Sequence, residues 1–279
     1  MTRQERRAQL KENLAAVAKR GIDLAAPRPD KLWRVIACTR LLMDTLDGKS
    51  PTRASGAARR AHEFFEVSLK FNPSEHRIAC AKGCGFCCHL RVTAMAPEVF
   101  LLANHIRREF KNEFETVLAR LRATDANVRG LNARERATHH YACGLLVDNS
   151  CSVYSARPSA CRALTSISVE TCKRGYEGEE VEVMTPAVWT EIRGAHNQAL
   201  WAALAHAGLS YDAYELNHAL LIALETKDAE ARWLAGEDVF AAAGREREDE
   251  DGEALKKRIC ERLIAGAMGR ELPPLVERI

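Results

Sequence analysis

The sequence predicts a mainly α-helical protein in which two irregular, cysteine-rich loops converge on one centre. Apolar residues recur at three- and four-residue intervals over most of the chain, which is the spacing of a helix with one buried face. Alternating apolar and polar residues, which are typical of strands, allow at most a short strand or two. Two turn-rich segments, 80–89 and 141–172, hold eight of the ten cysteines.

Helices are predicted on both sides of these loops. Ahead of the first loop the pattern predicts three, over 3–20, 33–47 and 50–71, the last bounded by Pro51 and Pro73. Between the loops it predicts helices over 97–110, 113–126 and 132–137. After the second loop, Val181 and Val183 indicate a short strand, and helices follow over 187–207, 211–226, 228–235 and 254–268. The charged run 244–253 is expected to be a solvated loop.

The chain of 279 residues is long enough to build its own core. We expect an N-terminal helical segment (1–75), a cysteine-cluster segment (76–175) and a C-terminal helical segment (176–279), packed as one globular unit. The net charge of +3 gives no electrostatic case for nucleic acid, and no apolar run approaches the roughly 20 residues of a membrane span. The charged N-terminus lacks the apolar stretch of a secretory signal, so a cytoplasmic location is expected.

The eight clustered cysteines are expected to bind metal. In a reducing compartment such cysteines are more often metal ligands or redox centres than disulfides, and a disulfide between the neighbours Cys87 and Cys88 would be strained. Loops of two or three residues let successive thiolates surround one centre, and Gly83 and Gly85 permit the tight backbone. The expected ligands are Cys80, Cys84, Cys87, Cys88, Cys143, Cys151, Cys161 and Cys172. Cys38 and Cys260 stand alone in helical patterns and are expected to be buried side chains.

Basic and aromatic residues of the second loop are expected to surround the thiolates. Four thiolates around a divalent metal or a [4Fe–4S] cluster leave negative charge that must be balanced when partly buried. Arg157 and Arg162 lie on either side of Cys161 and are expected to balance it, while Tyr154 donates a hydrogen bond or packs over the site. His89 directly follows the first four cysteines and is either a further ligand or a neighbour of the site.

The spacing of the first three cysteines has a second interpretation. Cys80-x3-Cys84-x2-Cys87, with Phe86 before the third cysteine, is also the pattern of radical S-adenosylmethionine enzymes, in which three thiolates hold a [4Fe–4S] cluster. That fold needs repeated parallel βα units, which this helical pattern does not supply. It also gives no role to Cys88 or to the later cysteines. The sequence therefore disfavours that fold.

Two blocks of the sequence resemble a known family. "CAKGCGFCC" (80–88) and "CGLLVDNSCSVYSARPSACR" (143–162) resemble the bacterial CxxxCxxCC cysteine-cluster proteins of the YkgJ type, which are described as zinc- or iron-chelating proteins. Flagellin lysine methylases carry a related cluster. The second block of this family usually begins Cys-Pro-Phe-Leu, whereas here Cys143 is followed by Gly-Leu-Leu. The resemblance covers about 80–172 and implies metal binding there.

The sequence leaves the metal and the activity open. An iron–sulfur cluster is favoured over zinc, in part because the flagellin methylases look like iron–sulfur proteins. The expected function is that of a metal-binding cysteine-cluster protein. The alternatives are a protein-lysine methyltransferase that uses S-adenosylmethionine at an iron–sulfur cluster, and a redox sensor or electron carrier. Metal ions are the expected partners, a protein partner or substrate stays open, and no catalytic residue stands out.

Overall fold

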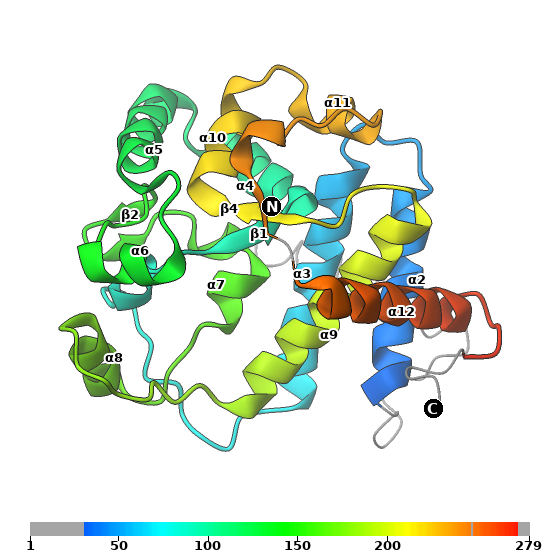
Figure 1. Ribbon diagram of the computed structural model, residues 1–279, viewed down its shortest axis with the longest axis horizontal. Coiled ribbons are helices and arrows are strands. Elements are labelled where there is room, and N and C mark those ends of the chain that lie inside the picture. The colour runs from blue at the N-terminus through cyan, green and yellow to red at the C-terminus, as the bar shows by residue number, and fades with distance from the viewer. Residues whose placement is uncertain (1–30, 247, 273–279) are drawn as a thin grey trace.

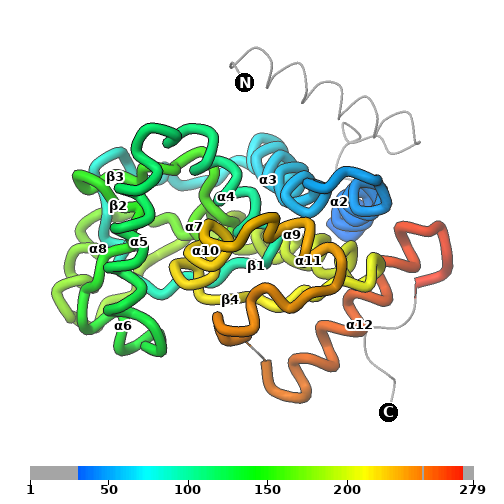
Figure 2. The backbone as a smooth tube through the Cα atoms, turned by 90° about the horizontal axis from the view of Figure 1, so that it is seen from above, coloured from blue at the N-terminus to red at the C-terminus, as the bar shows by residue number. Residues whose placement is uncertain are grey.

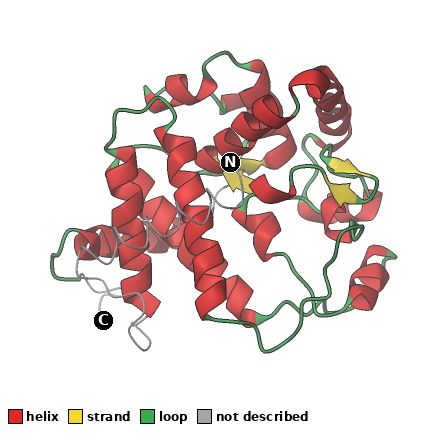
Figure 3. Cartoon of the chain, turned by 180° about the vertical axis from the view of Figure 1, so that it is seen from behind, coloured by secondary structure: helices red, strands yellow, loops and turns green. Residues whose placement is uncertain are grey.

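The fold is built mainly from helices, as the sequence predicts (Figure 3). The computed structural model describes residues 31–246 and 248–272, so the helix expected over 3–20 lies outside the described residues. The α-helices within these ranges are α2 (Lys31–Leu46), α3 (Arg53–Phe71), α4 (Ala96–Glu109), α5 (Phe114–Val128), α6 (Ala133–His139), α7 (Ser159–Ala163), α8 (Val169–Tyr176), α9 (Ala187–His206), α10 (Leu216–Glu225), α11 (Ala229–Leu234) and α12 (Glu250–Ala267). Among them, none is both long and apolar enough to cross a membrane.

Three long helices, α2, α3 and α9, lie side by side and carry much of the core (Figure 1). The buried face of α3 is made of small residues, because Ala54, Ala57, Ala58 and Ala61 have no exposed surface. Small side chains let neighbouring helices approach closely, and α4 and α9 both pack against α3. Helix α12 packs across α2 and α9.

Within the described residues, five short strands form two small antiparallel sheets. One has the order β1 (Thr93–Met95), β4 (Ala213–Glu215), β5 (Arg245–Glu246), and the other is the hairpin of β2 (Leu146–Val147) with β3 (Ser150–Cys151). β1 leads directly into α4 and β4 into α10, so their pairing aligns these two helices, which pack on each other. Asp148 and Asn149 take positive φ angles of 48° and 54° in the hairpin turn, as a turn of mirror-image type requires.

The cysteine-bearing segments gather at one end of the molecule. Seen from above, α5, α6, α8 and the β2–β3 hairpin lie at this end, and α2 and α12 lie at the other (Figure 2). The second cysteine segment is less irregular than expected, because Cys161 lies on α7 and Cys172 on α8. The Ser168 side chain accepts a hydrogen bond from the Thr171 N–H and so caps α8.

Three other boundaries differ from the sequence prediction. The strand expected at 181–183 is wrong: Val181 and Val183 have no partner strand and lie against the Gly175 side of α8. The helix expected over 211–226 begins only at Leu216, because 213–215 pair with β1 as β4. The loop expected over 244–253 contains β5 and the first turn of α12, where Asp249 accepts a hydrogen bond from Gly252 N–H as a cap.

Candidate metal centre

The two cysteine loops meet around one cavity of about 310 Å³. Six of the eight clustered cysteines line it, three from each loop: Cys84, Cys87, Cys88, Cys143, Cys151 and Cys161. The Cys143 N–H donates to the Cys88 carbonyl at 2.8 Å, which joins the two loops through their backbones. Residues that are far apart in the sequence therefore place their thiols around a common space.

Cys80 and Cys172 lie beside this cavity, outside the residues that line it. The Ser166 N–H donates to the Cys80 sulfur at 3.3 Å and fixes its position. Burial raises the pKa of the Cys80 thiol, and the negative charges of Cys87 and Cys172 raise it further. The helix that carries Cys172, α8, packs against the 3-10 turn of residues 86–89. Cys172 of the second loop is thus a neighbour of the first loop's thiols.

Four other thiols, those of Cys88, Cys143, Cys151 and Cys161, form a second neighbourhood that also draws on both loops. Burial raises the pKa of the Cys161 thiol, and the charges of Cys143 and Cys151 add to the increase. Cys88 of the first loop is a neighbour of Cys143 and Cys151 as well. The spatial groups therefore cut across the two sequence blocks.

Cys87 lies where the two groups meet. A hydrogen bond from the Cys88 thiol lowers the pKa of Cys87 to about 7 against the opposing effect of burial, and the positive charge of Arg157 assists. The thiolate is the form that binds metal. The Cys88 hydrogen bond and the Arg157 charge therefore both favour the metal-binding form of Cys87.

A known family model matches the stretch that builds this centre. The CxxCxxCC model, described as a putative zinc- or iron-chelating domain, matches residues 79–185, just over a third of the chain. Residues 79–185 are therefore similar to this domain. The match includes all eight clustered cysteines and confirms the family suggested by the two sequence blocks. No curated protein and no solved structure matches the chain.

The rest of the cavity wall is largely apolar. Its side chains include those of Leu90, Val92, Leu102, Leu145 and Leu216. Leu102 comes from α4 and Leu216 from α10, the helices that the β1–β4 pair aligns. An apolar wall excludes water and strengthens electrostatic interactions at the thiols. Sequence reasoning missed Leu216 and its neighbour Asn217, because nothing in the sequence links 216–217 to the cysteine loops.

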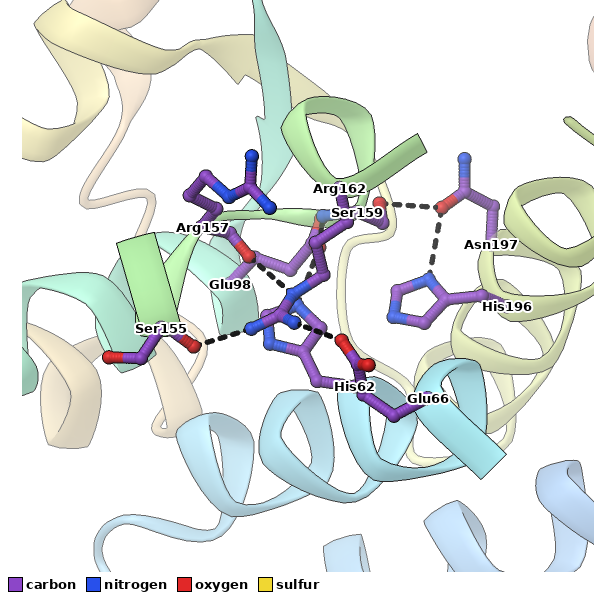
Figure 4. A network of polar contacts seen from close by, with 9 residues as sticks. All are labelled: His62, Glu66, Glu98, Ser155, Arg157, Ser159, Arg162, His196 and Asn197. Carbon is purple, nitrogen blue, oxygen red and sulfur yellow. Dashed lines mark hydrogen bonds and ion pairs between the residues drawn. The ribbon is translucent and has the colours of Figure 1, made fainter. Parts of the chain in front are cut away.

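The three residues expected around the thiolates have different positions. Arg157 lines the cavity, with its guanidinium carbon 3.6 Å from the centre of the Tyr154 ring. Tyr154 also lines the cavity but is largely exposed, as a side chain packed over the opening would be. Arg162 lies outside the lining residues. Its guanidinium pairs with Glu66 at 2.6 Å and donates to the Arg157 and Ser155 carbonyls at 2.8 and 2.5 Å (Figure 4).

The histidine that follows the first cysteines belongs to an aromatic cluster. His89 Nδ1 donates a hydrogen bond to the Gly85 carbonyl oxygen of its own turn, at 3.2 Å. Its ring packs edge-on against Tyr176 at 4.9 Å between ring centres, and His140 stacks on Tyr176 at 4.0 Å. Tyr176 is the last residue of α8. The cluster therefore ties the Cys172 helix to both cysteine loops.

Gly144, which stands where the family pattern has proline, is closely surrounded by α5. A Cβ atom on Gly144 would lie 3.1 Å from the Leu121 Cα, from the Leu121 Cδ2 and from the Thr124 Oγ1. The loop that carries Cys143 thus runs directly against the backbone of α5. A residue with a side chain at 144 requires the loop or α5 to move.

We expect Gly144→Ala to lower the free energy of unfolding by about 1–2 kcal/mol, because of this crowding. Gly194→Ala is the matched control. Gly194 lies in α9 and has nothing within 4 Å of the added Cβ, so alanine should stabilise the helix by about 0.5–1 kcal/mol. Urea unfolding of both variants measures the two changes. Equal stability of Gly144→Ala and the parent chain would show that the loop moves away from α5 at no cost.

Proposed function

We propose that the segment 79–185 holds an iron–sulfur cluster through its clustered thiolates. The observation that carries this proposal is that the thiols surround a cavity. A four-thiolate zinc site is closed, since each sulfur lies about 2.3 Å from a single ion and no space is left among them. An iron–sulfur cluster is larger, because it contributes its own inorganic sulfide as well as several metal ions. A space of about 310 Å³ suits the larger group.

The surroundings of the thiols also suit a cluster. The Arg157 guanidinium at the cavity wall supplies positive charge against the thiolates. The apolar wall limits access of water, and solvent exposure is one of the factors that set the potential of such clusters. When bound, the cluster would supply one-electron chemistry. The chain's own contribution is to hold it, balance its charge and shield it.

The test is the metal and acid-labile sulfide content of protein purified without air. We expect iron and sulfide in equal amounts, a brown chromophore and a paramagnetic resonance signal on reduction, because thiolate-bound clusters combine these properties. Colourless protein with one or two zinc ions and no sulfide would refute the cluster and support a metal-handling or structural zinc module. Chelator treatment then separates these two, since a structural zinc site unfolds when stripped.

A methyltransferase is the second candidate, and the apolar side of the cavity favours it. The leucine and valine side chains of the wall would contact the aliphatic part of a methyl donor or of a lysine side chain bound next to the cluster. Binding of S-adenosylmethionine to the reconstituted protein supports this candidate, and no binding excludes it while leaving the cluster itself untouched.

A further inference from the structure

A second group of ligand atoms lies behind the cysteine loops, between α3, α4 and α9. His62, Glu98 and His196 each offer one ligand atom, and the three atoms lie within 4.8 Å of one another. All three residues are buried, with exposed fractions of 5%, 2% and 0%. Figure 4 shows the side chains reaching toward one another from their separate helices. None of the three residues lies in either cysteine loop. Glu98 lies within the matched segment 79–185, and His62 and His196 lie outside it.

The hydrogen bonds of His196 leave one ring nitrogen without a partner. Its Nδ1 lies 3.2 Å from the Oδ1 of Asn197, an oxygen that also accepts from the Ser159 hydroxyl at 3.1 Å. Nδ1 therefore carries the proton, and the lone pair is on Nε2. That nitrogen is buried and has no hydrogen-bond partner among the described residues. A buried polar atom left unpaired costs about 1–3 kcal/mol, so an unpaired nitrogen aimed into a ligand cluster calls for an explanation.

The other two residues complete a set of donors for one ion. His62 Nε2 lies 3.1 Å from the Oε1 of Glu98, and the rings of His62 and His196 stack with centres 5.5 Å apart. Glu98 Oε1 also accepts from the Ser159 N–H at 2.7 Å. Ligating side chains are usually oriented by outer hydrogen bonds of this kind, as Asn197 orients His196. The positive charge of Arg162 acts on both histidines, and this arginine is already paired with Glu66.

We propose that His62, Glu98 and His196 bind one divalent transition-metal ion, separate from the thiolate centre. Two imidazoles and a carboxylate are a donor set that zinc and ferrous iron use in proteins. With bonds of about 2.0–2.2 Å, tetrahedral ligand atoms lie about 3.4 Å apart, so the three atoms have to move closer together, and the stacked rings have to turn so that both lone pairs face the ion. The proton on His62 Nε2 moves to Nδ1, which changes the tautomer and leaves the charge of the ring the same. The ion would then lie next to Ser159, whose N–H donates to Glu98 and which precedes Cys161 by two residues.

The test uses the full chain with its thiolate centre already reconstituted. One equivalent of Co²⁺ is added to the folded, reconstituted protein, with a short incubation in one preparation and a prolonged incubation in a second, so that slow entry into a buried site does not hide binding. Bound cobalt is counted after gel filtration, and X-ray absorption at the cobalt edge identifies the neighbouring atoms. We expect one additional ion with nitrogen and oxygen neighbours.

Two variants locate the ion. His196→Gln should bind the additional ion at least tenfold more weakly and keep the iron and sulfide of the thiolate centre. His218→Gln is the matched control, because His218 is also buried, is bonded through Nδ1 (2.8 Å from Asp125 Oδ1) and has an unpartnered Nε2, yet lies outside the three-residue cluster. It should bind cobalt like the parent chain. The proposal is overturned if neither parent preparation binds cobalt, if the neighbours are sulfur, or if folded His196→Gln binds as tightly as the parent.

Discussion

Cys161→Ser is expected to lose more than half of the bound metal and to aggregate more readily. Cys161 lines the cavity on α7, and burial together with the charges of Cys143 and Cys151 raises the pKa of its thiol. Such a thiol ionises easily only when a metal compensates its charge. Serine is a poor ligand for soft metals. When the metal is lost, the negative charges of the neighbouring thiolates are no longer balanced. Metal and sulfide per chain, measured on protein purified without air, give the result.

The controls are the two cysteines outside the cluster. Cys38 on α2 and Cys260 on α12 are buried in the helical core, with exposed fractions of 2% and 3%. Burial raises the pKa of Cys260 to about 11, as expected for an unreactive core thiol. Cys38→Ala and Cys260→Ala should therefore keep the full metal content. Metal loss from either variant equal to that of Cys161→Ser would contradict the division into eight clustered and two structural cysteines.

Glu98→Ala is expected to lower the free energy of unfolding by about 3 kcal/mol, because it leaves buried donors without an acceptor. The carboxylate accepts from the Ser159 N–H at 2.7 Å and lies 3.1 Å from His62 Nε2. Although burial alone would raise the pKa of Glu98, these hydrogen bonds and the neighbouring histidines hold it at about 2, so the carboxylate is charged. Urea unfolding at matched metal content measures the loss.

Glu66→Gln is the control for the same network. Glu66 pairs with Arg162, but its side chain is 60% exposed, so water can replace it. An exposed ion pair contributes about 0–1 kcal/mol, and Arg162 keeps its two carbonyl acceptors in the variant. A loss for Glu66→Gln as large as that for Glu98→Ala would mean that the arginine, and not the buried carboxylate, holds α7 in place.

The sequence predicts most helices closely because their signals are local. Pro97 lies in the first turn of α4, Gly48 follows α2, and Asn132 caps α6 with Glu135 in reciprocal hydrogen bonds. The strands were harder, since each is two or three residues long and is defined by a partner far along the chain, as Thr93 is by Glu215. Val181 and Val183 alternate like a strand but have no such partner.

The candidate site also has a part that the sequence predicts and a part that it does not. The spacing of the cysteines predicts a shared centre, and six of them line one cavity. Their spatial grouping does not follow their order, because α8 returns Cys172 to the first loop. His62, Glu98 and Leu216 carry no sequence signal at all. They join the region only through the packing of α3, α4 and α10, which depends on the whole fold.

The β1–β4 pairing determines at which stage of synthesis the cavity can be completed. All eight clustered cysteines precede residue 173, but Leu216 and Asn217 of the wall follow β4, and β4 is the partner that aligns α10 with α4. A ribosome makes the cysteines first and Leu216 of the wall about 45 residues later. During that interval we expect the thiols to be open to solvent and oxidants. Insertion of metal into a shielded site has to wait until the wall residues Leu216 and Asn217 have been synthesised.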